Sequence, residues 1–441
     1  MNKRTGEIEY PRQCGCECKE KGYLTATGNT TGNATGNATG NATGNATGNA
    51  TINWRSGTVE LLKSKFIERY GGTAQGLRVF RAPGRVNLIG EHTDYNDGFV
   101  LPAAIDREFL MVVRPRDDGH VRIYSANMKS ETEFGLSSIE KIEGRWGNYV
   151  RGVAVRLLER GFALKGFDGV LSSTVPTASG LSSSAALEVL AARVFEALSG
   201  FVMDAVEQAK ACQRAENEFI GVKCGIMDQF ISRLGKKGNA LLIDCRSLRY
   251  EHVPIPEGVR IIIVDTGVKR QLASSAYNER RAQCEEAVRA MARHKPGAAA
   301  LRDFTLEEFE QRKCELPEIV AKRARHVISE NERVLAAVDA LRKNDVKTFG
   351  KLMYASHKSL RDDYGVGCRE LDTIVEAARK TTGVFGARMT GAGFGGCGVI
   401  LAKAEAAEDV VKRVGDEYEK MIGKRPEIYV CTAEDGAGEI E

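Results

Sequence analysis

A run of polar residues near position 90 has side chains suited to holding a polyhydroxylated ligand. Glu91, His92 and Asp94 place several hydrogen-bond donors and acceptors close together, and glycines bracket the run. Sugar hydroxyls both donate and accept, so these residue types can hold a sugar. Arg85, just before them, can balance phosphate charge or hold a carboxylate. An exposed acidic turn or a metal site also fits the run, although Mg²⁺ prefers oxygen ligands and substrate phosphates.

A second segment, residues 176–184, reads Pro-Thr-Ala-Ser-Gly-Leu-Ser-Ser-Ser. Gly180 allows a tight turn, and the serines then open a helix whose first amides lack intrahelical partners. Such a helix start attracts a phosphate chain, and the hydroxyls can also meet a metal ion. The segment matches neither the Walker pattern nor Gly-x-Gly-x-x-Gly. A plain serine N-cap is the alternative interpretation.

Two acidic residues lie farther along the chain. Asp228 stands in an apolar stretch, where a carboxylate is costly unless it is paired or used. It can pair with Arg85 or accept a proton from an attacking hydroxyl; a helix cap or ordinary salt bridge is the alternative. Glu216, on a neighbouring helix, is a candidate magnesium ligand. A glycine-rich turn at residues 388–398 follows a strand and can close a nucleotide site, but alone it is weak evidence.

The elements that must position these residues alternate between helix and strand. Helical spacing of apolar residues and glycine stops predict helices, and short apolar runs predict strands. The predicted helices begin near Asn53 and then cover 148–159, 183–198, 204–219, most of 266–382, and 404–421. The predicted strands are 77–80, 109–113, 121–124, 169–174, 240–244, 259–265, 384–389, 398–401 and 428–431.

Bulk composition limits the class of protein. The chain has 441 residues, 42% of them apolar, and a formal net charge of only +4. This length predicts two packed units and a tail, and the charge gives no argument for nucleic acid or a membrane surface. No apolar run reaches spanning length, and the first residues lack the apolar core of a secretory signal. We therefore expect a cytoplasmic protein with reduced cysteines.

Residues 1–52 are expected to be a disordered, low-complexity tail. A Thr-Gly-Asn-Ala unit recurs from Thr27 to Asn49 without any large apolar side chain, so the segment cannot offset its chain entropy by burial. Cys14, Cys16 and Cys18 can bind a soft metal, but a structural zinc site needs a fourth ligand at suitable spacing.

Taken together, three of these segments resemble the ordered motifs of the GHMP kinases, and specifically those of the galactokinase family. The resemblance runs from about Trp54 to the C-terminus. Its motifs are residues 84–96 (Gly-Arg-Val-Asn-Leu-Ile-Gly-Glu-His-Thr-Asp-Tyr-Asn), 180–184 (Gly-Leu-Ser-Ser-Ser) and 390–396 (Thr-Gly-Ala-Gly-Phe-Gly-Gly). Further similar runs are 215–219, 225–229, 243–248, 277–281 and 361–364.

The resemblance implies ATP-dependent phosphorylation of galactose at its C1 hydroxyl, with Mg²⁺ as cofactor. Asp228 would act as base or orienting group, and Arg85 would stabilise negative charge and hold Asp228 ionised. The residues implied to bind the sugar are Arg85, Glu91, His92, Thr93, Asp94, Gly225, Asp228 and Tyr277. Those implied to bind ATP are Ser125, Ala178, Ser179, Gly180, Leu181, Ser182, Ser183 and Ser184. Ser184 and Glu216 would hold magnesium.

The implied fold is mixed α and β in two lobes, residues 53–250 and 251–441. The N-terminal lobe would contain a left-handed β-α-β unit, against the general rule, and the C-terminal lobe would be ferredoxin-like. The active site would lie between the lobes. One departure from the family is that residues 176–179 lack a glycine that many members carry after the proline. We expect a monomer without nucleic-acid or membrane partners. Phosphorylation of arabinose or N-acetylgalactosamine, or a non-catalytic galactose and ATP sensor, are the alternatives.

Overall fold

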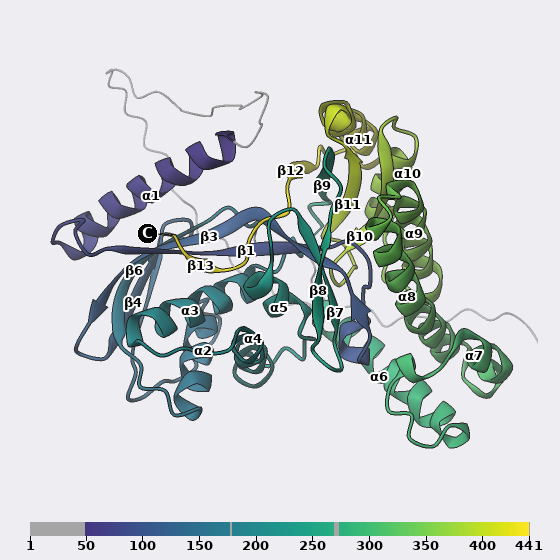
Figure 1. The fold of residues 1–441 in the computed structure, drawn as a ribbon, viewed down its shortest axis with the longest axis horizontal. Helices are drawn as coiled ribbons and strands as arrows, with labels where there is room; N and C mark the ends of the chain where they lie inside the picture. Colours follow the sequence, from purple (N-terminus) through teal and green to yellow (C-terminus); the bar gives the residue numbers. More distant parts are fainter. Residues whose placement is uncertain (1–48, 177–178, 269–272, 441) are drawn as a thin grey trace, which may run out of the picture. The chain divides into compact units, whose positions relative to one another are not determined.

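The computed structural model describes residues 49–176, 179–268 and 273–440 (Figure 1). The repeat segment and Cys14, Cys16 and Cys18 lie outside the described residues, so the predictions for them stay untested. The first described element is the helix α1, which starts at Asn49, four residues before the predicted start. The helices are α1 (Asn49–Tyr70), α2 (Asn148–Glu159), α3 (Ser183–Ser199), α4 (Ala205–Arg214), α5 (Met227–Leu234), α6 (Ala273–Met291), α7 (Leu306–Arg312), α8 (Glu318–Arg342), α9 (Val346–Ser359), α10 (Arg369–Arg379) and α11 (Ala407–Ile422).

A six-stranded sheet forms the centre of the N-terminal part, in the order β13-β1-β3-β6-β4-β5. Side chains alternate between its two faces. On β1, Val79 packs into a cluster with Phe66 of α1, whereas Phe80 belongs to the main core with helix α3. Figure 1 accordingly shows α1 and α3 on opposite faces of the sheet. Its strands are β1 (Arg78–Asn87), β3 (Pro102–Arg116), β4 (His120–Ser125), β5 (Ser130–Gly135), β6 (Gly166–Ser173) and β13 (Gly438–Glu439).

The chain forms two further sheets. An antiparallel four-stranded sheet has the order β10-β11-β9-β12. Ile262 and Val264 on β9 pack into a cluster with α10 and α11, while Ile261 and Ile263 join the main core. The remaining sheet is β2-β7-β8. The strands are β2 (Phe99–Val100), β7 (Asn239–Asp244), β8 (Tyr250–Pro254), β9 (Val259–Asp265), β10 (Val384–Thr390), β11 (Cys397–Lys403) and β12 (Glu427–Cys431).

The mixed α and β character is confirmed, and most predicted elements are present. Helix α2 has the predicted bounds. The predicted helix 204–219 divides, because α4 ends at Arg214 and a π-helical turn, Ala215–Ile220, follows. The predicted strand 77–80 is too short, since β1 continues to Asn87 and carries Arg85 within the sheet. Strands β2, β5, β8 and β13 were not predicted.

The predicted boundary between the two lobes, near position 250, stays a prediction. One hydrophobic core contains residues from both sides of position 250, and the final strand β13 pairs with β1. The chain's C-terminal end therefore completes the N-terminal sheet. A parallel pair, β4 and β6, is connected through β5 and α2, but the hand of this connection stays a prediction. In the described part of the chain, no helix has the length and apolarity required to cross a bilayer.

Candidate active site

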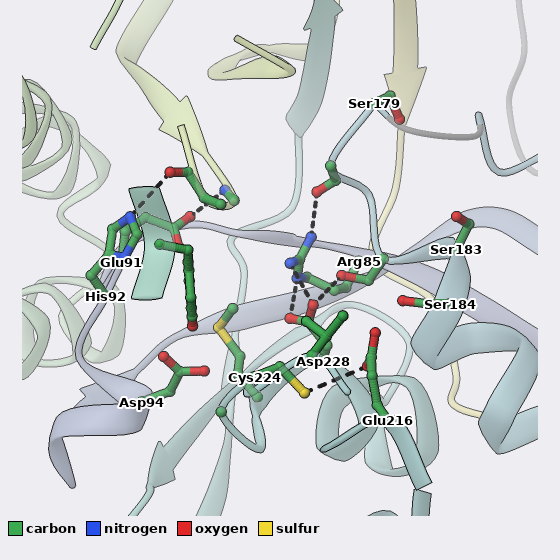
Figure 2. Close-up of a pocket in the computed structure, with 18 of the residues that line it drawn as sticks. Arg85, Glu91, His92, Asp94, Ser179, Ser183, Ser184, Glu216, Cys224 and Asp228 are labelled. Atoms are coloured by element: carbon green, nitrogen blue, oxygen red, sulfur yellow. Dashed lines mark hydrogen bonds and ion pairs between the residues drawn. The ribbon is translucent and has the colours of Figure 1, made fainter. Parts of the chain in front are cut away.

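A cavity of about 790 Å³ brings the chemistry-bearing motifs together (Figure 2). It is lined by residues from the end of β1, the start of α3, the segment 216–228 and the glycine turn after β10. The predicted site residues that line it are Arg85, Glu91, His92, Asp94, Ser179, Gly180, Ser182, Ser183, Ser184, Glu216, Gly225, Asp228 and Tyr277. The spatial convergence on which the sequence interpretation depends is thus present.

Arg85 and Asp228 form a two-pronged ion pair at the centre of the cavity. Arg85 Nε donates to Asp228 Oδ1 at 2.7 Å, and its NH2 group donates to Oδ2 at 2.8 Å. The third guanidinium nitrogen donates to the carbonyl of Gly180 at 2.6 Å. Burial lowers the pKa of Arg85 but the charges of Asp228 and Glu91 outweigh it, so its pKa is raised and the guanidinium stays charged. Arg85 therefore links the Asp228 carboxylate to Gly180 in the segment 176–184, the candidate phosphate-binding loop (the phosphate-loop candidate).

The start of helix α3 has no side-chain cap. Ser182 occupies the N-cap position with a positive φ of 59°, yet its hydroxyl does not cap the helix. It donates instead to Asp228 Oδ2 at 2.5 Å. The first amides of α3 are consequently left for another acceptor, and the helix dipole favours a negatively charged one. The sequence alternative of a plain serine cap is therefore wrong.

Close packing explains the glycine before the arginine. A Cβ atom on Gly84 would lie 2.8 Å from the Leu181 carbonyl oxygen and 3.1 Å from a methyl group of Val175. The backbone N–H of Arg85 donates to that same carbonyl at 3.1 Å. The phosphate-loop candidate is thus fixed directly against β1.

Glu216 and Ser184 lie next to each other at the edge of the cavity. Burial, followed by the charge of Asp228, raises the pKa of Glu216, and the Ser184 hydroxyl acts in the opposite direction. The donor set of one hydroxyl and one carboxylate suits a hard cation that keeps phosphate ligands. Across residues 49–176, 179–268 and 273–440, no group of three or more His, Cys, Asp or Glu side chains is arranged to hold a metal by itself.

Glu91 and His92 hold the glycine turn after β10. Glu91 Oε1 accepts from the Gly391 N–H at 2.7 Å and from buried Arg388 at 3.4 Å. His92 Nε2 lies 3.2 Å from the Ala392 carbonyl, and Nδ1 lies 2.7 Å from the Tyr95 hydroxyl. Since a carbonyl only accepts, Nε2 carries the proton and Nδ1 accepts from Tyr95. Burial lowers the pKa of His92 to about 3, so the ring is neutral.

Asp94 is a cavity carboxylate with a strongly raised pKa. Burial, followed by the charges of Asp228 and Glu91, raises its pKa to about 7. A Cβ on Gly225 would lie only 1.9 Å from Asp94 Oδ2, so Gly225 provides the space for this carboxylate. The ring of Tyr277 lies 5.6 Å from that of His92, centroid to centroid, on the same side of the cavity.

Figure 2 divides these residues into two groups. In its view Glu91, His92 and Asp94 lie to one side of the Arg85–Asp228 pair, and Ser183 and Ser184 lie to the other. The side chains that can hydrogen-bond a polar substrate therefore lie on one side of the Asp228 carboxylate, and the start of α3 lies on the other.

Not every predicted site residue reaches the cavity. Thr93 is fully buried, and its hydroxyl donates to the carbonyls of Gly90 and Phe99. Leu181 belongs to the main core. Ser125 lies at the end of β4, outside the cavity lining, and its hydroxyl accepts from the Met128 N–H at 3.3 Å. Ala178 lies outside the described residues.

The sequence interpretation missed several lining or supporting residues. Cys224 and Asp265 line the cavity, and Glu188 and Gln229 lie directly behind Glu216. A signal for Glu188 was present, because it is a single carboxylate in the apolar run 185–190 of a buried helix. Burying a carboxyl is costly unless it has a purpose.

Comparison with known proteins agrees with the geometry. The models for the GHMP kinases N terminal domain and the GHMP kinases C terminal region match residues 148–236 and 337–420. A solved mevalonate kinase has the same fold, with a TM-score of 0.57 at 19% identity over 81% of this chain and 99% of that one. The fold and the site thus define a GHMP kinase.

Closer relatives narrow this class. The model of the galactokinase galactose-binding signature matches residues 64–115. A galactokinase of Chloroflexus aggregans is 50% identical over 84% of this chain and 95% of its own, and one of Roseiflexus sp. is 46% identical over 86% and 96%. The structure of Lactococcus lactis galactokinase complexed with galactose has a TM-score of 0.83 at 40% identity, covering 87% of this chain and all of that chain. The chain belongs to the galactokinase family.

Proposed function

We propose that this chain transfers the γ-phosphate of ATP to the C1 hydroxyl of galactose, giving galactose 1-phosphate and ADP. The observation that carries the proposal is the Arg85–Asp228–Ser182 constellation. One carboxylate is fixed by a guanidinium and a hydroxyl directly beside the open amides of α3. An acceptor hydroxyl held at this carboxylate faces the anion site, as in-line phosphoryl transfer requires.

In the proposal, one side of the cavity binds the sugar, next to the carboxylate that takes the proton. Glu91, His92, Asp94 and Tyr277 hold the sugar, and the backbone at Gly225 leaves room for Asp94. Asp228 accepts the hydrogen bond of the attacking hydroxyl and takes its proton. Arg85 balances the negative charge on the attacking oxygen and the transferred phosphoryl group. Arg85 is buried, so water screens this interaction poorly.

The phosphates lie on the other side of Asp228. The amides at the start of α3, with the residues from Ser179 to Ser184, hold the phosphate chain. Ser125 and Ala178 stay predictions for nucleotide contact.

Magnesium fits the donors that the chain offers. Ser184 and Glu216 would hold the ion, since a hydroxyl and a carboxylate are the hard oxygen ligands it prefers. When bound, it would neutralise charge on the transferred phosphoryl group. Among the described residues, the hydrogen-bond donors to the Glu216 carboxylate are the uncharged Gln229 amide and Cys224 thiol, which leaves its charge for a cation.

The test is a coupled assay of ADP formation with galactose, glucose, arabinose and N-acetylgalactosamine. Galactose should be turned over fastest, and faster turnover of another sugar would overturn the assignment. Asp228→Asn should retain ATP and galactose binding but lose about 10²–10⁴ in turnover, the usual contribution of a general base. Near-normal turnover of this variant would exclude the role given to Asp228.

We further propose that the chain acts as a monomer in the cytoplasm, without nucleic-acid or membrane partners. The small net charge supports the absence of nucleic-acid and membrane partners, and the eight described cysteines, all free thiols, suit a reducing compartment. Light scattering of the purified protein tests the monomer; a dimer mass would contradict it.

A further inference from the structure

The side-chain amide of Gln229 joins two carboxyl groups behind the cavity. Its Nε2 donates to Glu216 Oε2 at 2.7 Å and to Glu188 Oε2 at 3.0 Å. Glu188 and Gln229 are both fully buried, and Glu216 is only 7% exposed. An amide nitrogen has two N–H groups, so this one serves each carboxyl with one hydrogen.

Three elements meet at this amide. Glu188 lies one turn after Ser184 on α3, so both side chains share a helix face. Gln229 follows Asp228 directly on α5. Glu216 lies on the π-helical turn after α4, and Figure 2 shows it extending toward the cavity near Ser184. The amide thus lies between the residues given to proton transfer and those given to the metal.

Glu188 is not part of an ion pair. No lysine or arginine approaches it within 4.0 Å in the described part of the chain, and its Oε1 has no hydrogen-bond partner there. Its Oε2 accepts from the Gln229 amide, so Glu188 contributes a buried hydrogen-bond acceptor to this cluster.

The position of this acceptor determines the orientation of the amide. Rotating Gln229 by half a turn would present its oxygen to Glu216 and leave both carboxyl oxygens without a donor. A buried acceptor that loses its donor is strongly disfavoured. With Glu188 in place, the amide nitrogen must face both carboxyl groups, and Glu216 is then fixed through Oε2.

We infer that Glu188 is a positioning residue that keeps the Gln229 amide nitrogen turned toward Glu216 and so pre-orients the Glu216 carboxylate for the metal. The inference rests on the proposed function, in which Glu216 is a magnesium ligand. Glu188 does not line the cavity and acts only through Gln229. Groups that hold metal ligands in this manner typically contribute about 10–100-fold to metal affinity.

Two variants separate the acceptor from the shape of the side chain. Glu188→Met keeps a similar length without an acceptor, whereas Glu188→Gln keeps one. Calorimetry of a non-hydrolysable ATP analogue over a Mg²⁺ series gives the Mg²⁺ concentration for half-maximal binding, without any turnover. We expect this concentration to rise about tenfold in Glu188→Met and to stay near the parent value in Glu188→Gln. The galactose dissociation constant and the far-ultraviolet circular dichroism should be unchanged in both.

A double-variant comparison tests the route through the amide. Gln229→Met should raise the Mg²⁺ requirement at least as much as Glu188→Met, and the two changes together should be no worse than Gln229→Met alone. Multiplying effects would overturn the inference. So would a parent-like Mg²⁺ requirement in Glu188→Met, equal losses in Glu188→Gln and Glu188→Met, or a matching loss of galactose affinity.

Failure of the proposed function can be distinguished from failure of the inference about Glu188. If the proposed function is wrong, the parent protein forms no ADP from galactose, but the binding of the ATP analogue still compares the variants. If Glu216→Gln left the Mg²⁺ requirement unchanged, the inference about Glu188 would fall even with a parent protein that phosphorylates galactose.

Discussion

Replacing Asp94 by asparagine should make the sugar-free protein more stable at pH 8 but not at pH 4. Burial and the neighbouring charges of Asp228 and Glu91 raise the pKa of Asp94 from 3.8 to about 7. The folded protein therefore holds a proton that the unfolded chain has released. Stability falls as the pH rises from about 4 to about 7, and it is constant with respect to this group above pH 7.

The magnitude follows from the separation of the two pKa values. At about 1.4 kcal/mol per pH unit, the full penalty above pH 7 is ~4 kcal/mol. Asp94 is only half-buried and faces the open cavity, so water screens part of it and we expect about 2 kcal/mol. At pH 4 this group is protonated in about 40% of unfolded chains, and the penalty is below about 1 kcal/mol.

Calorimetric melting of Asp94→Asn and parent at both pH values measures the effect. The variant should melt about 2 °C higher at pH 8, for a chain of this size, and at nearly the same temperature at pH 4. Asp117→Asn, at a side chain that is 97% exposed, serves as the matched control and should show no such difference. An equal shift of Asp94→Asn at both pH values, or none at pH 8, would refute the reasoning.

Three further substitutions test packing and charge. Gly225→Ala places a Cβ 1.9 Å from Asp94 Oδ2, and calorimetric titration should show galactose affinity falling at least about tenfold, or ~1.4 kcal/mol. Glu108→Gln should lower the free energy of unfolding by about 3 kcal/mol in a urea titration, because fully buried Glu108 holds Arg81 at 2.5 Å. Phe66→Ala should lower it by about 3 kcal/mol in the same measurement, because Phe66 is fully buried between α1 and the sheet.

Matched controls exist for each substitution. Gly57→Ala meets nothing within 4 Å and should leave galactose binding unchanged. Glu318→Gln removes an exposed charge, and Leu61→Ala changes a side chain of α1 that is 55% exposed; each should shift unfolding by no more than about 0.5 kcal/mol. If a buried substitution cost no more than its exposed counterpart, the burial argument for it would be wrong.

Much of the fold could be predicted because its signals are local. Helix α2 has a regular apolar stripe and a glycine just after it, and its predicted bounds were correct. Strand β5 was missed because it is an edge strand in which only Thr132 and Phe134 are buried, so its apolar pattern is weak. The length of β1 was missed because Arg81 and Arg85 are buried through ion pairs rather than through apolarity.

The sequence by itself determined which residue types and turns are available for chemistry. A glycine followed by serines at a helix start, and a carboxylate in an apolar stretch, are local features that constrain backbone and burial directly. They were enough to identify the motifs of the family, because these motifs are short and contiguous.

Only the tertiary structure decided how these groups are paired. Arg85 and Asp228 are 143 positions apart, and the Ser182 hydroxyl bonds to Asp228 instead of capping its own helix. The Gln229 amide donates to Glu188 on α3 and to Glu216 on the π-helical turn after α4. Such pairings depend on which elements the chain topology brings into contact, and the spacing of residues along one element carries no information about that.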